Sequence, residues 1–535
     1  ILAIFDKEKL EGILNLGDDI IEYTNMTKGH RFLAPQSFKV ESFSDYQEKL
    51  RKAFVVTDRE ERKSIIMEMA QNSANAQGLE LKNDPSLLEE VCGLIEWPNP
   101  LMGKIQHEFM TVPPEVLVCA MRSHQKYFAL IDHDGELSPN FITISNMPSN
   151  SKRDKTTVNG NERVLSARLS DAKFFWDQDR AVKLRSRIPA LENVKFYEKL
   201  GSIGEKMARV ERLGYYLSRH VPGANGQSLK RAAQLAKADL TTLMVGEFPE
   251  LQGIMGSYFA HNDKEPEEIC LAIKEHYSPQ GPSDYCPTAP LSVVLSLADK
   301  IDTLVGFFAI NEKPTGSKDP FALRRYALGV IRLIMENSLK LPLEKAITES
   351  LRLYPNFVSD NGLMDFIIER LKVYLRTEGI RHDRIAAVFA SGDDDDLNKL
   401  INRMKALDRF LSTNDGINLL TAYRRGANIV SIESKKDGTS FNTAPDKRLF
   451  QLEQETNLSE ALAKTINALL NFLENEEFDK AMEALATLRA PVDNYFEHVT
   501  VNASDPKLRA NRLRSLSLIV KTMNKVADFS LIENT

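Results

Sequence analysis

The sequence LSVVLSLADKIDTLVGFF, Leu291–Phe308, decides the fold class of most of the chain. Its apolar residues recur every three or four positions, which is the period of an α-helix. Its longest apolar run, Leu291–Ala298, is far shorter than the ~20 residues that a membrane span needs. The stretch therefore predicts a helix of a soluble globular protein, and no contact with a membrane is expected.

Similar helical patterns lie on both sides of this stretch and continue to the C-terminus. They fill residues 181–338, continue through 339–433 and resume in a last helical region at 434–535. The polar segment Ser434–Lys447, with its Gly, Pro and Lys residues, predicts a linker or a hairpin-like excursion at the start of the last region.

Toward the N-terminus, residues 1–180 mix helices with short strands. Leu117–Met121, Tyr127–Asp132 and Phe141–Ser145 have the composition of strands, and His133–Gly135 carries the Asp-Gly signal of a tight turn between the last two. Strand patterns stop after about Arg180. We therefore predict an α+β module followed by mostly all-α domains.

Bulk composition excludes some classes of function and leaves others open. The 535 residues carry a net charge of −6, so a nucleic-acid partner cannot be inferred from total charge, and any basic footprint must be local. The four cysteines form no CxxC pair, which argues against a zinc site or a disulfide framework and fits a cytoplasmic protein. No phosphate-binding GxxxxGK[ST] loop is present. Because the first residue is Ile1, we expect that an N-terminal part is missing.

The segment MRSHQKYF, Met121–Phe128, holds the sharpest polar cluster of the α+β module. If one strand ends there and the next begins, His124 and Lys126 project from a sheet edge, where they could donate to phosphate or ester oxygens of RNA. The other interpretation is a turn in which His124 bonds to backbone. We favour the turn and keep both residues as candidates for RNA binding.

Nine segments in order along the chain resemble the β subunit family of the bacterial heterotetrameric glycyl-tRNA synthetases. They are TKGHRFLAP (Thr27–Pro35), MRSHQKYFAL (Met121–Leu130), GNERVLSARLSDAKFFWDQD (Gly160–Asp179), KLGSIGEKMARVERL (Lys199–Leu213), KADLTTLMVGEFPELQGIMG (Lys237–Gly256), EHYSP (Glu275–Pro279), LADKIDTLVGFF (Leu297–Phe308), DPFALRRYALGVIRLI (Asp319–Ile334) and LRAPVDNYFEHVTVNASDPKLRANRLRSL (Leu488–Leu516).

The resemblance implies a division of labour. A partner α subunit is expected to carry the site for glycine, ATP and Mg²⁺, in an α2β2 assembly, while this chain binds tRNA(Gly) and holds no catalytic residue. In domain order, residues 1–180 are similar to an α+β module of the phenylalanyl-tRNA synthetase β chain. Residues 181–338 resemble an HD-type helical domain, 339–433 a helical linker domain, and 434–535 a DALR-type anticodon-binding domain.

HD phosphohydrolases need two histidines and two aspartates around metal, and this chain keeps two of those residues. Asp239 matches the second residue of the His-Asp pair, but Ala238 stands where the ligand histidine should be, and Asp299 matches the distal aspartate. Two carboxylates without the imidazoles bind divalent ions weakly. We expect no metal site, and expect Asp239 and Asp299 to pair with basic neighbours or to cap helices. The dipeptide His382-Asp383 lies outside this region and predicts only a helix start.

The C-terminal segment carries the candidate RNA contacts. Asp505 and Pro506 predict a helix start, and at ~100° per residue the basic residues after it divide between two faces. Those opposite the apolar face form a basic stripe for tRNA: Lys507, Arg514, Lys521 and Lys525. Arg509 and Arg512 fall nearer the apolar side and are predicted to brace neighbouring helices, although both stay candidates for tRNA binding.

Two rival functions stay open. One is a metal-dependent phosphohydrolase of the HD type, against which Ala238 argues. The other is a tRNA-binding module without a catalytic partner, which copurification of a glycyl-tRNA synthetase α chain would decide.

Overall fold

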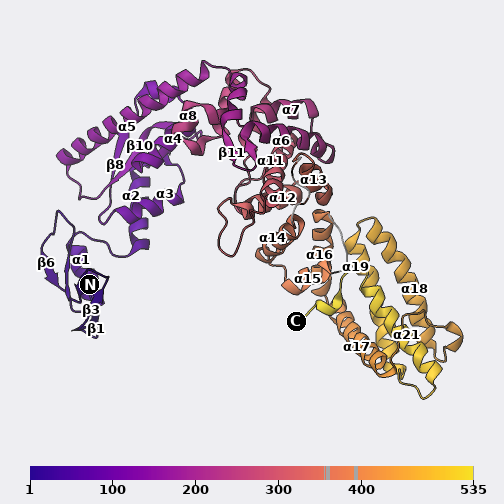
Figure 1. Ribbon diagram of the computed structural model, residues 1–535. Coiled ribbons are helices and arrows are strands. Elements are labelled where there is room, and N and C mark those ends of the chain that lie inside the picture. The colour runs from indigo at the N-terminus through magenta and orange to yellow at the C-terminus, as the bar shows by residue number, and fades with distance from the viewer. Residues whose placement is uncertain (355, 357–358, 360–361, 391–395, 534–535) are drawn as a thin grey trace. The chain divides into compact units, whose positions relative to one another are not determined.

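The computed structural model describes residues 1–354, 356, 359, 362–390 and 396–533 (Figure 1). These residues form two compact units. The first unit joins Ile1–Ser186 to the later segment Asp239–Asn262, and the second joins Arg187–Ala238 to the rest of the chain from Asp263. No helix in the described ranges has the length and apolar character to cross a membrane.

The centre of the first unit is an antiparallel four-stranded sheet in the order β7-β9-β10-β8. Helices α2 and α3 cover one face, where Ile66, Val91 and Ile142 contribute to one hydrophobic cluster. On strand β10 the neighbouring Phe141 is also fully buried, in contact with β8. Gly103 lies opposite it on β8, where a Cβ would come within 2.3 Å of the Phe141 ring, so the sheet needs glycine at this position. The strands are β7 (Glu80–Leu81), β8 (Asn99–Lys104), β9 (Phe128–Ile131) and β10 (Leu137–Ser145).

Helices and three small hairpins complete the first unit. Helix α5, a 30-residue helix, packs with its second half along β8 and α8 (Figure 1). The hairpins β1-β2, β3-β4 and β5-β6 lie before α1. The helices are α1 (Phe43–Lys52), α2 (Arg59–Asn75), α3 (Pro85–Leu94), α4 (Pro114–Ala120), α5 (Ser151–Arg180), α8 (Leu243–Glu247) and α9 (Ile254–Asn262); the hairpin strands are β1 (Ile4–Phe5), β2 (Glu8–Lys9), β3 (Ile13–Asn15), β4 (Ile20–Glu22), β5 (Met26–Lys28) and β6 (Ser37–Lys39).

The regular elements of the second unit, in the residues that the structure describes, are helices and one small hairpin. Helix α11 is at its centre. Every residue of this helix from Leu291 to Phe308 is buried. Helices α6, α7, α10, α12 and α13 pack around it. Its elements are β11 (Lys195–Tyr197), β12 (Gly201–Ser202), α6 (Ile203–Leu217), α7 (Gly226–Leu235), α10 (Glu267–Glu275), α11 (Pro290–Ala309), α12 (Leu323–Glu336), α13 (Leu343–Leu351), α14 (Leu363–Thr377), α15 (His382–Phe389), α16 (Leu397–Leu411), α17 (Asn414–Asp437), α18 (Glu453–Glu474), α19 (Phe478–Ala486), α20 (Arg489–His498) and α21 (Pro506–Met523).

The predicted fold class, an α+β module followed by helical domains, is confirmed, and so are the strands at Tyr127–Asp132 and Phe141–Ser145 with the turn between them. The strand predicted at Leu117–Met121 is wrong. This segment belongs to helix α4 and the turn after it. A short apolar run is compatible with either structure, and here Pro114 at the first turn favours the helix.

Two further boundaries differ from the prediction. The hairpin β11-β12 follows Arg180, so strands do not stop there. Ser434–Asp437, predicted as the start of a linker, form the last turn of α17, which ends at Gly438 with φ 62°. His382-Asp383 begins α15, as predicted.

Candidate functional site

Helix α21 carries the predicted basic stripe on a face that is only partly covered. The Asp505 side chain accepts hydrogen bonds from the backbone N–H groups of Lys507 and Leu508, which confirms it as the N-cap. Lys507 and Lys521 are exposed and Arg514 is half-buried. Because their spacing is seven residues, these three share one face, and we call them the α21 stripe.

Lys525, by contrast, lies beyond the helix. The last helical residue is Met523, so the predicted position of Lys525 on the helix face is wrong, although its side chain is exposed. The apolar pattern could not locate this end, because Val526 and Ala527 beyond it are also fully buried.

Arg512 and Arg509 connect α21 to its neighbours. Arg512 is buried, with Nε 3.0 Å from Glu455 Oε1 on α18, and it donates to the Thr500 carbonyl. Burial works against ionisation of Glu455, but hydrogen bonds, above all from Arg512, hold its pKa below the usual range. Arg509 pairs with Glu433 and Asp437 on α17. Both arginines therefore have carboxylate partners inside the helical bundle.

The segment between α17 and α18 lies along α21. The Asn511 side chain accepts from the Asp446 N–H at 2.7 Å and donates to the Asp446 carbonyl at 3.0 Å. Lys521 Nζ donates to the Asn442 carbonyl at 2.6 Å. A hydrogen bond from the exposed Arg448, together with other positive charge, lowers the pKa of Asp446 to about 2. Arg448 is not among the residues predicted from the sequence, because it lies between the predicted linker Ser434–Lys447 and the helical pattern that begins at about Leu449.

His124 and Lys126 do not lie at a strand edge. They belong to a single π-helical turn after α4 and to its end, where Lys126 takes a left-handed φ of 58°. Lys126 Nζ forms an ion pair with Glu90 at 2.8 Å and donates to the Ser123 carbonyl. The His124 ring lies 5.7 Å from the ring of Phe248. The prediction of a position between two strands is therefore wrong, because α4 replaces the first of them.

The turn borders a cavity of about 370 Å³ in the first unit. Glu250 accepts hydrogen bonds there from Ser123 Oγ at 2.8 Å and from the Cys119 thiol at 3.0 Å. Burial raises the pKa of Cys119 to about 12. A thiol in that state is a poor nucleophile at neutral pH, so the cavity has no activated cysteine.

Asp239 is fully buried and accepts hydrogen bonds from backbone N–H groups. Its Oδ2 accepts from the N–H groups of Gly253 at 2.6 Å and Gly256 at 2.9 Å, at the start of α9. A carboxylate at a helix N-terminus is stabilised by the free N–H groups there. This is a helix-capping role of the kind expected from the sequence.

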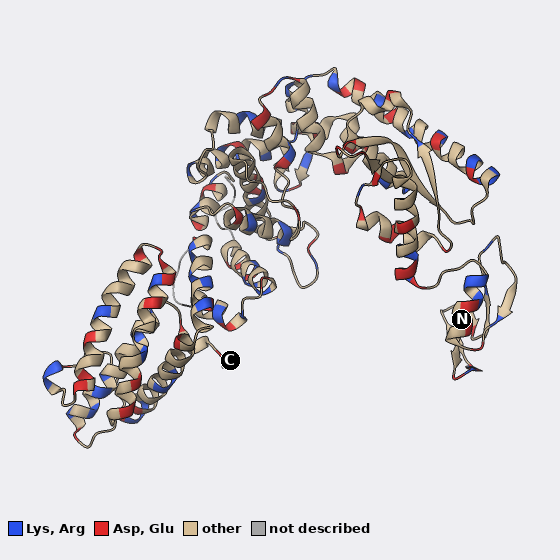
Figure 2. Cartoon of the chain, turned by 180° about the vertical axis from the view of Figure 1, so that it is seen from behind, with Lys and Arg blue, Asp and Glu red and all other residues tan. Residues whose placement is uncertain are grey.

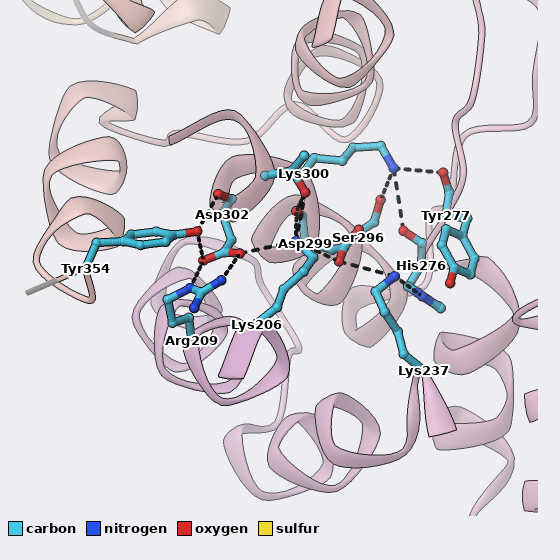
Figure 3. A network of polar contacts seen from close by, with 11 residues as sticks. Lys206, Arg209, Lys237, His276, Tyr277, Ser296, Asp299, Lys300, Asp302 and Tyr354 are labelled. Atoms are coloured by element: carbon cyan, nitrogen blue, oxygen red, sulfur yellow. Dashed lines mark hydrogen bonds and ion pairs between the residues drawn. The ribbon is translucent and has the colours of Figure 1, made fainter. Parts of the chain in front are cut away.

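Asp299, on α11, is at the centre of a buried polar network in the second unit (Figure 3). Its Oδ1 lies 3.3 Å from both Lys206 Nζ and Lys237 Nζ. Lys237 Nζ is also 3.0 Å from His276 Nε2. Burial opposes the charge of Asp299, but the two ammonium groups outweigh it and hold its pKa well below the usual range. Burial and the nearby Lys237 lower the pKa of His276, so this imidazole is neutral.

Asp302, one turn further along α11, completes the network. It accepts from Lys206 Nζ at 3.2 Å, Arg209 Nε at 2.9 Å and the Tyr354 hydroxyl at 3.1 Å (Figure 3). These contacts join α6, α11 and the chain after α13.

Lys300 faces the other side of α11. Its Nζ donates to the carbonyls of Tyr277 at 2.8 Å and Ser278 at 3.1 Å, and to Ser296 Oγ at 3.1 Å. Burial lowers the pKa of Lys300 to about 7.

The groups around Asp299 do not fit a divalent metal. Such an ion needs deprotonated oxygen or imidazole ligands directed at one point. Here two ammonium groups, those of Lys206 and Lys237, approach the carboxylate, and the second of them also lies against the imidazole of His276. The chemical role of this arrangement is to hold helices together.

Comparison with known proteins gives two family matches. Residues 1–390 match the family model described as glycyl-tRNA synthetase beta subunit, and residues 419–532 match the DALR anticodon binding domain. The second match begins within α17 and covers α21.

Curated relatives match the whole chain. A glycine–tRNA ligase beta subunit from Rhodospirillum centenum is 49% identical over 560 residues, which cover 100% of this chain and 78% of the relative. Proteins of the same name from Ruegeria sp. and Phenylobacterium zucineum are each 45% identical, covering 100% and 99% of this chain and 77% of each relative.

Proposed function

This chain belongs to the glycyl-tRNA synthetase beta subunit family, and we propose that it serves such an enzyme by holding tRNA(Gly) while a partner α subunit carries out the chemistry. As a subunit of a glycine–tRNA ligase it takes part in the reaction of ATP, glycine and tRNA to glycyl-tRNA, AMP and diphosphate. Holding the tRNA makes delivery of its acceptor end an intramolecular event.

The observation that carries the proposal is the α21 stripe. It lies within the residues that match an anticodon-binding domain, and its cations make no ion pair within the described ranges, in contrast to Arg509 and Arg512 on the same helix. Exposed Lys and Arg side chains neutralise phosphates and release counterions, which supplies most of the affinity for nucleic acid.

We further propose that ATP and Mg²⁺ act at the α subunit and that Asp239 and Asp299 form a remnant without metal. The support is the set of partners of these carboxylates: the backbone N–H groups of α9 for Asp239 and two ammonium groups for Asp299. A phosphohydrolase would need those carboxylates for its metal.

The assembly and location follow from the same proposal. The names of the relatives imply an α partner, and we propose an α2β2 heterotetramer in the cytoplasm. All four cysteines are free thiols, which suits a reducing compartment.

Pyrophosphate exchange tests this division of labour. The chain alone should neither form glycyl-adenylate nor exchange pyrophosphate with ATP, and adding the α subunit should create glycyl-tRNA synthesis. Robust exchange by the pure chain would refute the proposal. Failure of an α chain to copurify would instead favour a tRNA-binding module without a catalytic partner.

A further inference from the structure

The first half of α5 is a helix that this chain leaves largely uncovered. All buried residues of α5 lie at or after Leu165, so residues 151–164 pack little against the sheet. Isolated helical turns gain little stability in water, and helices in proteins are mostly stabilised by packing of one face. One side of this half is exposed, at residues 151–152, 155–156, 159–160 and 163–164, and the other side is half-buried.

One face of this half carries hydrogen-bond donors. At ~100° per residue, Lys152, Lys155, Asn159 and Arg163 fall within about 80° of one another, on a side of the helix that is on average about 100° around from Leu165 and Leu169. Lys152, Lys155, Asn159 and Arg163 are exposed or nearly so. We call the three cations Lys152, Lys155 and Arg163 the α5 stripe; at 1.5 Å per residue it spans about 16 Å.

No carboxylate neutralises the α5 stripe. The two acidic residues of this half are bound to the backbone: Asp154 accepts from the Asn150 N–H at 2.8 Å, and Glu162 accepts from the Lys104 N–H at 2.8 Å. The three cations make no ion pair in the described parts of the chain. In the second half of the same helix, Lys173 and Arg180 both pair with Asp177, at 2.6 and 2.9 Å.

Gly160 lies beside the stripe and is not required by the fold. A Cβ there would meet no atom within 4 Å. Glycine inside a helix is less stable than alanine, so a helix with open space at this position would be more stable with alanine. Glycine also marks places where another molecule comes close to the backbone. The open space at Gly160 therefore leaves room for a partner close to the backbone at this face.

We propose that the α5 stripe binds the phosphate backbone of tRNA. Phosphate oxygens only accept hydrogen bonds and carry negative charge, which complements a face with three unpaired cations, an amide and no carboxylate. Along most helices of the chain, basic and acidic residues alternate (Figure 2). The α5 stripe differs from them because its face carries cations without acidic residues. The inference rests on the proposed function, because it places a second tRNA contact in the α+β module in addition to the α21 stripe.

The test is tRNA binding by the enzyme assembled from this chain and its α subunit. The triple variant Lys152→Ala, Lys155→Ala, Arg163→Ala should bind tRNA(Gly) on the order of 50-fold more weakly at 0.15 M salt, with the slope of log affinity against log salt smaller by about two. Lys173→Ala, on the same helix but paired with Asp177, is the matched control and should keep both the affinity and the slope.

A second variant separates binding from folding. Gly160→Gln should raise the melting temperature slightly, because glutamine is the better helix former and meets open space, yet it should weaken tRNA binding several-fold. Gly160→Ala should raise stability with a smaller loss of binding.

Three outcomes overturn the inference. Triple-variant enzyme that binds tRNA with unchanged affinity and slope would show the face to be merely solvated. Loss of assembly with the α subunit at unchanged tRNA binding would identify a protein contact instead. Absence of tRNA binding by the unaltered enzyme would refute the proposed function as well, which distinguishes the two failures.

Discussion

Lysine and arginine have opposite uses in the core of the second unit and on helix α21. Lys206 and Lys237 are buried beside Asp299, and their charges are neutralised by carboxylates of the same chain. Lys507 and Lys521 have the same side chain, but they are exposed and meet no carboxylate in the described ranges. The difference is therefore the surroundings, above all access to water.

Buried and exposed cations should differ in how much folding stability is lost when they are removed. Removing one partner of a buried ion pair costs about 3–5 kcal/mol, since the other charge stays buried without compensation. An exposed cation contributes about 0–1 kcal/mol to stability, but it can release counterions from a phosphate. Stability and tRNA affinity should therefore respond to different residues.

The largest effect is expected for Asp299→Ala. It leaves two buried ammonium groups without this carboxylate and should lower the free energy of unfolding by about 3–5 kcal/mol, measured by chemical denaturation. Asp479→Ala is the control: this carboxylate pairs with Arg409 at the surface, and its loss should cost within ~0.5 kcal/mol. Equal losses of stability in the two variants would show that burial does not decide the cost of losing an ion pair.

An intermediate effect is expected for Arg512→Ala, which removes a cation from the packed side of α21. The Thr500 carbonyl loses a donor and Glu455 loses its cation, but Glu455 keeps the hydrogen bonds from the Gln451 and Leu452 N–H groups, so the cost should be about 1–3 kcal/mol, less than for Asp299. Melting curves measure this loss, and any weakening of tRNA binding should disappear at temperatures where the variant is fully folded. A binding defect with an unchanged melting temperature would place Arg512 among the RNA contacts.

The smallest effect on stability is expected for Lys521→Ala. Its hydrogen bond to the Asn442 carbonyl is at the surface, so the loss should stay within ~0.5 kcal/mol. The slope of log affinity for tRNA against log salt should nevertheless fall by about 0.7, the value for one phosphate contact of a single strand. Lys480→Ala, which removes a lysine paired with Glu477, should leave the slope unchanged. Salt titrations of tRNA binding measure these slopes, and Lys507→Ala, a second variant of the α21 stripe, should behave like Lys521→Ala.

The sequence predicted much of the fold but could not identify the partners of charged residues. The spacing of apolar residues predicted α11, and the neighbouring residues Asp505 and Pro506 predicted the capped start of α21. It failed for the apolar run in α4, where seven residues of helix and a strand give the same pattern, and the error displaced His124 and Lys126. The sequence also predicted that Asp239 and Asp299 cap a helix or pair with basic neighbours, and the structure shows such partners for both.

What the sequence by itself determined is the set of local features: the helical period, the caps, the absence of a nucleotide-binding loop, and a family resemblance that comparison with known proteins established. Only the tertiary structure decided which charges are neutralised. Lys206 and Asp299 are 93 residues apart in the chain, and their backbone and side-chain contacts exist only because α6 packs against α11. On α5, likewise, only the structure shows that Asp154 and Glu162 accept hydrogen bonds from backbone N–H groups and form no ion pair with the α5 stripe in the described residues. The energy of a charged side chain depends on its distance from other charges and on its burial. Both are set by how the chain folds and not by the neighbouring residues in the sequence.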